Sequence, residues 1–244
     1  FLTLFVAAVL LTGIYLKQPV TKTPPTTSTL TADKTLAGLA AATDAENQRA
    51  ALTSLARVWG RAVPAIGAAP SVEQALQAAG FKIHSYSGNL GGLIRLGYPA
   101  LLECKIPTAS AKRYLVLVGV DQAALRIATA EGTVFQVPMV RIEQYWTGKA
   151  LIPWRNPSGL PVPMRYDATT EQRQALASLL AAANAWTAGS ADYSDAALRT
   201  AIRRFQTQHG IEPTGVAGVL TMMQLYRSSK ELQIPSITRV EQTP

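Results

Sequence analysis

Three side chains of this sequence could take part in nucleophilic or metal chemistry: the single cysteine, Cys104, and the two histidines, His84 and His209. A thiol becomes a nucleophile when a neighbouring base lowers its pKa and takes its proton. His84 precedes Cys104 in a different predicted strand, and His209 lies in a different predicted domain. One cysteine forms neither an intramolecular disulfide nor a multi-cysteine metal site. We therefore expect no catalytic residue and no metal site, with Cys104 a small core residue and His84 a polar strand residue.

A second group of residues could bind an anion. Arg199 and Arg203 are spaced as neighbours on one helical face, which they share with Gln206. A pair of guanidinium groups can hold carboxylates in bidentate fashion. Thr214 follows in the next predicted loop. We predict a binding site formed by Arg199, Arg203, Gln206 and Thr214, and an ordinary solvated arginine face is the alternative.

The net charge of +8 is unevenly distributed along the 244 residues. Residues 17–164 contain 15 basic and 8 acidic residues, whereas residues 165–244 contain 8 and 7. A basic surface suits an anionic partner such as membrane headgroups, nucleic acid or wall polymer, although it can also serve solubility alone.

The N-terminal residues 1–16, FLTLFVAAVLLTGIYL, contain no charge and no proline. A spanning helix needs about 20 apolar residues, so this segment predicts a truncated transmembrane helix. The alternative is the apolar region of a signal peptide, but no A-x-A cleavage signal follows. Residues 17–30 are rich in Pro and Thr and predict an extended linker. We thus expect a single-pass membrane protein with its bulk outside the bilayer.

Residues 31–157 predict an α+β domain. Helical patterns cover residues 33–60, starting from Asp33 as N-cap, and residues 72–80, and a short strand follows at residues 81–86. A short helix at residues 89–95 precedes four apolar runs separated by turn residues, which predict four antiparallel strands. These runs are YPALLECKI, RYLVLVGVD, ALRIATAE and TVFQVPMV.

The segment KRYLVLVGVD, residues 112–121, resembles the strand that carries the catalytic histidine in the papain-like double-glycine leader peptidases. In that family the histidine stands in an H-Y-V-V-L-x-G pattern, and Arg113 occupies its position here. The family's nucleophilic cysteine opens the first core helix, but no cysteine precedes Cys104. Arginine is always protonated and cannot act as a base. The resemblance therefore implies a degenerate peptidase fold, used as a docking surface rather than as an enzyme.

Residues 165–232 predict a second, three-helix domain, and residues 233–244 form a tail. Thr169 and Ser194 are suitable N-caps for helices over residues 170–186 and 195–210, and a third helix covers residues 219–227. The last two helices are separated by the turn PTGVAG. Its two glycines, Gly215 and Gly218, are expected to supply backbone freedom.

The segment AIRRFQTQHGIEPTGVAGVLTMMQL, residues 201–225, resembles the common peptidoglycan-binding domain. That family reads roughly A-V-x-x-F-Q-x-x-x-G-L-x-x-D-G-x-x-G-x-x-T-x-x-x-L, and Thr214 replaces its aspartate. The resemblance implies core positions at Phe205 and Leu225 and turn positions at Gly210, Gly215 and Gly218. It also gives the predicted anion site its ligand, because the stem peptide of peptidoglycan carries carboxylates.

The order of membrane anchor, linker, degenerate peptidase domain and wall-binding domain resembles the periplasmic part of the general secretion pathway protein A family (GspA/ExeA) of type II secretion. That resemblance implies an inner-membrane protein with its bulk in the periplasm and protein B of the same pathway as a partner. It also implies a role in secretin assembly and an ATPase domain outside this chain. The chain has no G-x-x-x-x-G-K-[ST] motif, so we expect no cofactor within it. No nucleic-acid partner is expected, and a homo-oligomer is left open.

Two other functions compete with this one. A peptidoglycan-targeted hydrolase or leader peptidase would need a catalytic constellation, for which the sequence offers no candidate. A plain structural tether without a partner protein also stays open, and the protein that co-purifies with residues 31–155 would separate it from the assembly factor.

Overall fold

The computed structural model describes residues 37–61, 71–107, 109, 111–164, 168–187 and 192–239. The predicted transmembrane helix at residues 1–16, the linker at residues 17–30 and the predicted cap Asp33 lie outside these ranges. Among the helices that are described, none has both the length and the apolar character needed to cross a bilayer.

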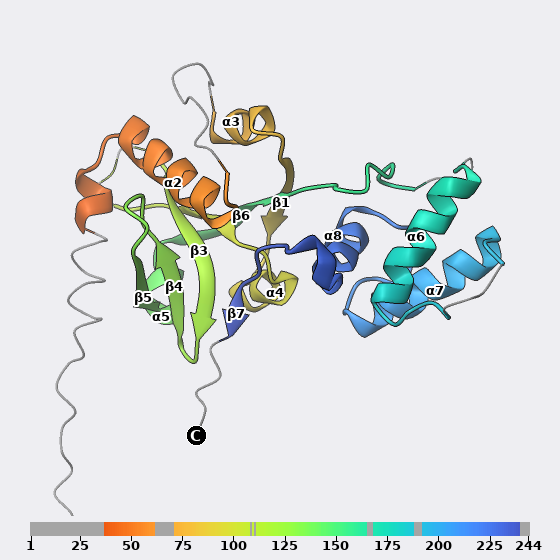
Figure 1. The fold of residues 1–244 in the computed structure, drawn as a ribbon. Helices are drawn as coiled ribbons and strands as arrows, with labels where there is room; N and C mark the ends of the chain where they lie inside the picture. Colours follow the sequence, from red (N-terminus) through yellow and green to blue (C-terminus); the bar gives the residue numbers. More distant parts are fainter. Residues whose placement is uncertain are drawn as a thin grey trace, which may run out of the picture.

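An antiparallel sheet forms the centre of the first half of the molecule (Figure 1). Its strands lie in the order β1-β6-β2-β3-β4-β5, and each pairs antiparallel with its neighbours. Their bounds are β1 Lys82–Ser87, β2 Ala100–Cys104, β3 Arg113–Asp121, β4 Ala124–Ala128, β5 Val134–Pro138 and β6 Trp146–Trp154. The short strand and the four apolar runs of the sequence are thus confirmed as β1 to β5.

Two strands were not predicted, and each has a physical reason. Strand β6 contains Pro153, which argues against a central strand. The pairing of β6 with β2 runs only from Trp146 to Leu151, so the missing N–H of Pro153 removes no bond to β2. Strand β7, Thr238–Arg239, has only two residues. It lies parallel to β3 at Gly119 and Val120, beyond the end of β2. No periodic pattern can mark a strand of two residues.

Helices cover both faces of the sheet. Helix α2 (Asp44–Val58) and helix α3 (Val72–Ala78) pack on one face, where Leu52, Leu55 and Leu76 meet Leu101 and Val116. Helix α2 begins at a capping box formed by Thr43 and Glu46. Helix α4 (Leu90–Leu96) and the short helix α5 (Met139–Glu143) lie on the other face.

The second half of the molecule consists of helices α6 (Thr170–Ala182), α7 (Asp195–Gln208) and α8 (Val219–Ser228), with a short 3₁₀ turn η2 at Lys230–Leu232. The predicted helix over residues 170–186 ends earlier, at Ala182, and Asn184 takes a positive φ of 56°. Figure 1 shows α8 between the sheet and the pair α6–α7. We call the two halves the sheet domain (residues 37–157) and the helical domain (residues 168–232).

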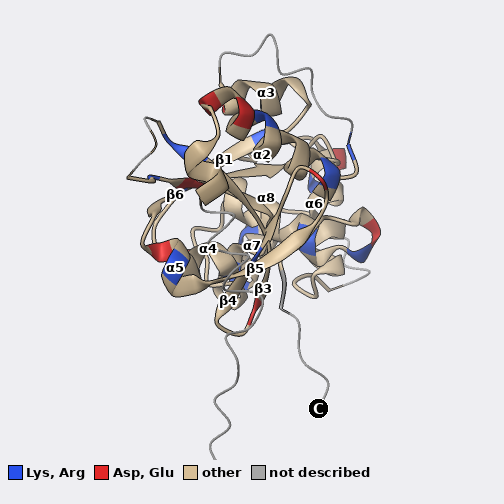
Figure 2. Cartoon of the chain, turned by 90° about the vertical axis from the view of Figure 1, so that its left-hand side faces the viewer, with Lys and Arg blue, Asp and Glu red and all other residues tan. Residues whose placement is uncertain are grey.

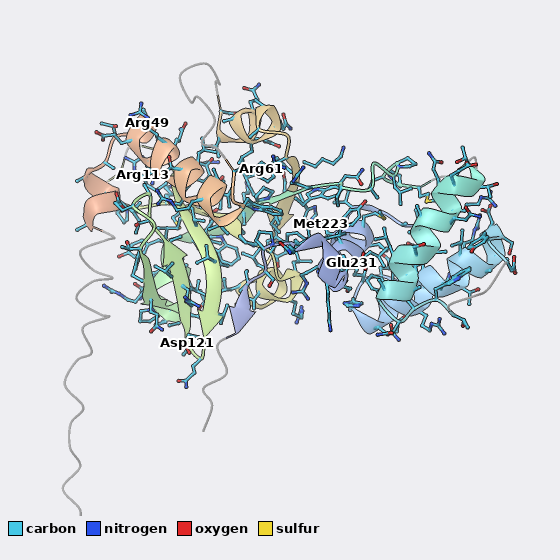
Figure 3. All side chains as sticks on the ribbon, viewed as in Figure 1. Arg49, Arg61, Arg113, Asp121, Met223 and Glu231 are labelled. Carbon is cyan, nitrogen blue, oxygen red and sulfur yellow. The ribbon has the colours of Figure 1, made fainter. Side chains whose placement is uncertain are left out.

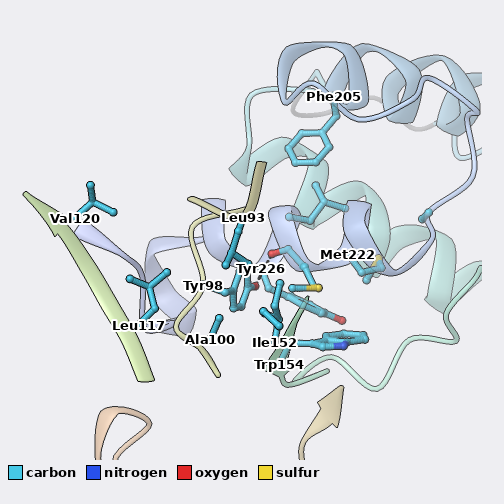
Figure 4. Close-up of a cluster of buried hydrophobic side chains, with 14 of the residues drawn as sticks. Leu93, Tyr98, Ala100, Leu117, Val120, Ile152, Trp154, Phe205, Met222 and Tyr226 are labelled. Atoms are coloured by element: carbon cyan, nitrogen blue, oxygen red, sulfur yellow. Dashed lines mark hydrogen bonds between the residues drawn. The ribbon is translucent and has the colours of Figure 1, made fainter. Parts of the chain in front are cut away.

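The two domains share one hydrophobic core, which passes through α8 (Figure 4). The Trp154 ring stacks on the Tyr226 ring at a centroid distance of 6.5 Å. The Tyr98 hydroxyl donates a hydrogen bond of 2.6 Å to the carbonyl of Met223, and Gln224 Nε2 donates one of 2.8 Å to the carbonyl of Leu96. Because these groups are buried, the contacts fix the helical domain against the sheet domain.

Candidate functional site

The loop between α7 and α8, residues 209–218, is the centre of the candidate site. Helix α7 starts at the Ser194 cap and buries Leu198, Ile202 and Phe205 at helical spacing, which fixes its orientation. It ends at Gln208 with His209 as its C-cap, and the next residue, Gly210, has a φ of +64° that reverses the chain.

Gln206 holds this loop in place from inside. Its side chain is only 1% exposed. Its Oε1 accepts a 2.9 Å hydrogen bond from the N–H of Gly215. Its Nε2 lies 2.9 Å from the carbonyl of Val216, 3.0 Å from Thr221 Oγ1 and 3.2 Å from Thr214 Oγ1. One amide therefore satisfies polar groups of three consecutive loop residues and of Thr221 at the start of α8.

Two cavities lie on either side of the loop. The larger, about 500 Å³, is a cleft between the two domains. We call it the interdomain cleft; among its lining residues are His84, Tyr86 and Arg95 from the sheet domain and His209, Thr214 and Thr221 from the helical domain. The smaller, about 200 Å³, lies between the loop, α6 and α7, and Arg173, Asp195 and Arg199 line it. Thr214 and Val216 border both cavities.

The four predicted binding residues occupy different places around the loop. Thr214 is exposed, and half-buried Arg199 lines the smaller cavity. Arg203 is exposed and lies against Gly215, where an added Cβ would come within 3.0 Å of Arg203 Nε. The prediction that Gln206 shares an exposed face with the arginines is wrong, because burial and the loop hydrogen bonds occupy its amide.

The motif positions are placed as follows. Phe205 and Leu225 are fully buried. Gly210 and Gly215 have positive φ, the latter +76°, as a tight turn requires. Gly218 differs: its φ is −82°, it forms the N-cap of α8, and nothing lies within 4 Å of an added Cβ. The expectation that Gly218 supplies unusual backbone freedom is therefore wrong.

The electrostatics of the interdomain cleft are set by few groups. Burial lowers the pKa of His84 below its ordinary value, and burial together with the nearby Arg227 does the same for His209. Both imidazoles are therefore neutral around pH 7. Of the lining side chains, Arg95 is cationic and Glu212 is anionic. Figure 2 shows the remaining Lys and Arg residues spread over several elements, with Asp and Glu among them.

Arg113 stands at the start of β3, in the position that the leader-peptidase resemblance gives to a histidine (Figure 3). It is 2% exposed and forms an ion pair with Asp44, the first residue of α2. It also donates hydrogen bonds to the carbonyls of Leu39 (2.9 Å) and Ala42 (2.8 Å). The arginine thus joins the start of α2 to the start of β3 through a permanent charge, and its guanidinium cannot accept a proton.

Next to this ion pair, Asn47 fixes α2 to the sheet. Its Oδ1 accepts a 2.8 Å hydrogen bond from the N–H of Tyr114, and its Nδ2 donates one of 3.2 Å to the carbonyl of the same residue. Asn47, Tyr114 and Thr129 line a groove of about 350 Å³ between α2 and strands β3 to β5. The groove contains neither Cys104 nor a histidine among its lining residues.

Cys104 is 1% exposed, and burial raises the pKa of its thiol to about 12. Strand β6 separates it from His84, which pairs with Ile152, whereas Cys104 pairs with Trp146 near the other end of β6. The thiol therefore remains protonated at neutral pH and has no imidazole beside it. Over the ranges that the structure describes, no group of three or more His, Cys, Asp or Glu side chains could hold a metal ion.

His84, Tyr86 and Arg95 were not predicted as site residues. They are separated from the 209–218 loop by more than one hundred positions of sequence, and no spacing rule connects them. Only the packing of α8 against Tyr98 and Leu96 brings them to the loop.

The segment that contains this loop matches a known protein family. Residues 169–225 match the family described as a putative peptidoglycan binding domain. They cover helices α6 and α7, the loop and most of α8.

More than half of the chain is similar to a protein of a general secretion pathway. It is 28% identical over 148 residues to general secretion pathway protein A of Aeromonas hydrophila, a match that covers 60% of this chain and 26% of that protein. The chain thus spans about a quarter of the length of this relative. The resemblance found in the sequence therefore extends to a curated member of that family.

A solved structure has the same fold. The periplasmic domain of the EpsAB fusion protein from the Vibrio vulnificus type II secretion system matches with a TM-score of 0.53 and 21% identity, over 85% of this chain and 91% of that one. The peptidase domain of Streptococcus ComA matches 47% of this chain at 20% identity, but its TM-score of 0.40 is a weak likeness from which nothing further follows.

Proposed function

We propose that this chain binds peptidoglycan without cleaving it, as the periplasmic region of a type II secretion assembly factor. The observation that carries this proposal is the family match over residues 169–225. The loop in that segment is exposed at Thr214 and Val216, fixed from beneath by Gln206, and bordered by two cavities. A rigid loop with adjacent cavities suits recognition because little ordering entropy is lost on binding.

The non-catalytic part of the proposal is supported by the chemistry of the sheet domain. The buried Cys104 thiol, with its raised pKa, is a poor nucleophile, and Arg113 cannot accept a proton. An ion pair between Asp44 and Arg113 connects α2 with β3 instead. We propose that this domain serves as a docking surface.

The cellular role rests on the similarity to general secretion pathway protein A. We propose that the chain is held at the inner membrane with its bulk in the periplasm, that protein B of the pathway is its partner, and that the pair assists assembly of the secretin. Nucleotide chemistry would then belong to a separate ATPase domain rather than to these residues.

The test of wall binding is co-sedimentation of the purified 244-residue chain with purified sacculi. We expect the chain to pellet with sacculi and to release no muropeptide or peptide product during prolonged incubation. Failure to pellet would refute wall binding, and release of a product that disappears in a Cys104→Ala variant would refute the non-catalytic proposal.

A further inference from the structure

Helix α8 is buried on every side. Residues 221–226 are each at most 3% exposed, and six consecutive residues of an α-helix point in all directions around its axis. Helix α6 contacts α8 within the helical domain, and the stack of Trp154 on Tyr226 joins α8 to the sheet domain. A helix that is buried all round belongs to an interior, so both domains determine the position of α8.

The chain that follows α8 returns to the sheet domain. Gln233 has a φ of 44° and a ψ of 45°, which turns the chain after η2. Ile234 and Ile237 then pack against the shared core, and the N–H of Ile237 donates a 2.9 Å hydrogen bond to the carbonyl of Gly97. Strand β7 follows directly and pairs with β3, beside which it lies in Figure 1. We call residues 233–239 the strap.

One short turn of the sheet domain, residues 96–98 between α4 and β2, contacts both α8 and the strap. The carbonyl of Leu96 and the hydroxyl of Tyr98 bind α8 through the two interdomain hydrogen bonds described above. Gly97, the residue between them, binds the strap through its carbonyl. An added Cβ at Gly97 would collide with the guanidinium of Arg227, so α8 also packs closely against this turn.

The strap is the second place where the chain crosses between the two domains. The first crossing runs from β6 to α6, and the hydroxyl of Tyr226 fixes it through contacts with Asn156 and Ser158. A single crossing allows two domains to rotate about the connection, whereas a second crossing restricts that rotation. Because β7 pairs with β3 at only two residues, the strap can open locally while both domains stay folded.

The position of α8 affects the loop at residues 209–218. Gly218 ends this loop and is the N-cap of α8. Thr221, in the first turn of α8, accepts a 3.0 Å hydrogen bond from Nε2 of Gln206, the side chain that also binds the N–H of Gly215. A displacement of α8 would therefore move the end of the loop and one partner of Gln206 together.

We propose that the strap positions α8 on the sheet domain, and that the 209–218 loop keeps its wall-binding shape only while the strap is in place. This inference rests on the proposed function. The strap residues are positioning residues, which act through α8 and not by contact with the wall. The sheet domain is thereby required for wall binding, although the family match lies in the helical domain. A loop that is already ordered loses less entropy when it binds.

Two changes release the strap. Deletion of residues 233–244 removes it, and Ile237→Asp places a carboxylate where an apolar side chain packs on the shared core. The matched controls are deletion of residues 240–244, which leaves the strap, and Ser236→Asp, which places the same charge at the exposed neighbour. Ile237→Val keeps both the N–H and the apolar side chain.

Each variant is compared with the 244-residue chain by co-sedimentation with sacculi and by amide hydrogen exchange in NMR. The N–H of Gly215 reports on the loop, because it donates to Gln206. The N–H of Tyr114 reports on the sheet domain, because it donates to Asn47. A strap that only stabilised the whole fold would change the exchange of both amides, whereas a positioning strap changes that of Gly215 alone.

We expect both strap changes to weaken sacculus binding about tenfold and to speed exchange at Gly215 about tenfold, with exchange at Tyr114 unchanged. Both controls and Ile237→Val should match wild type in the two measurements. If the deletion of residues 233–244 prevents folding, Ile237→Asp decides alone.

Unchanged sacculus binding in the strap variants overturns the inference. Faster exchange at both amides also overturns it, because the strap would then act on the whole fold. A loss of binding with exchange at Gly215 unchanged overturns it too, because the strap would then contact the wall directly. A wild type that does not pellet with sacculi overturns the proposed function, and exchange at Gly215 then still decides whether the strap positions the loop.

Discussion

Each domain contains one buried polar side chain that holds neighbouring segments together, Arg113 in the sheet domain and Gln206 in the helical domain. The two side chains have different effects on the residues around them. Arg113 forms an ion pair with Asp44 and donates hydrogen bonds to the carbonyls of Leu39 and Ala42. These contacts connect the start of α2 to the start of β3. Gln206 bonds to Gly215 and Val216 in the second half of the 209–218 loop and fixes this part of the loop between two cavities.

The difference lies in the charge of the two side chains. A buried guanidinium needs an anion, so Arg113 takes Asp44 as its partner and the two form a neutral ion pair. A buried amide is neutral and has both a donor and an acceptor end, so Gln206 satisfies the loop and leaves the neighbouring side chains available. The first arrangement suits a scaffold, and the second suits a recognition site.

The largest effect is expected from Arg113→Ala. The carbonyls of Leu39 and Ala42 would lose their donor, and half-buried Asp44 would lose its counter-ion. We expect the free energy of unfolding to fall by about 3 kcal/mol in urea titrations. Sacculus binding of the folded fraction should be unchanged, and a loss of binding at full folding would contradict the division of roles between the two domains.

Gln206→Ala should lower the free energy of unfolding less than Arg113→Ala does, but it should weaken sacculus binding more. It leaves the buried N–H of Gly215 without an acceptor, for an expected loss of about 2 kcal/mol in the same titration. Because the loop loses its fixed shape, sacculus affinity should fall as well. The comparison between the domains would fail if this variant bound walls like wild type.

Gly215→Ala tests the loop from its outer side. The substitution forces an L residue to a φ of +76° and places its Cβ 3.0 Å from Arg203 Nε. We expect a loss of about 1.5 kcal/mol. Gly218→Ala is the matched control, since its φ is −82° and its surroundings are open. Its effect should be about 0.5 kcal/mol, the difference between Gly and Ala at an N-cap.

Tyr98→Phe tests whether the two domains unfold as one body. The hydroxyl donates to the carbonyl of Met223 across the domain boundary. We expect a loss of about 1 kcal/mol with a single cooperative calorimetric transition. Two separate transitions in the wild type would show that the shared core does not couple the domains.

The smallest effect is expected from pH. His84 and His209 both have a folded-state pKa below the ordinary value of 6.5. Their neutral forms are favoured by folding, so their contribution is fully present above pH 6.5 and is lost as the pH falls below it. Stability measured by denaturation should therefore decline from pH 7 towards pH 5. The decline should be shallower in a His84→Gln/His209→Gln variant, and an identical slope would contradict the burial of both rings.

Many of the helices and strands could be predicted from the local spacing of apolar residues and turn residues. Strands β2 to β5 are apolar runs between turn residues, and α7 shows its buried face at 3–4 spacing because one stripe must meet the core. Strand β6 was hidden by Pro153. Gln206 was misplaced because a polar residue on a helix can face either water or a loop that needs its amide, and spacing alone does not separate the two.

The sequence by itself determined the two kinds of domain and the wall-binding motif, since each is a local matter of residue type and spacing. Only the tertiary structure decided that the domains share one core through α8, and that His84, Tyr86 and Arg95 meet the 209–218 loop in one cleft. The physical reason is that contacts between distant segments depend on how complementary apolar surfaces pack. That complementarity belongs to the assembled shape and not to any window of sequence.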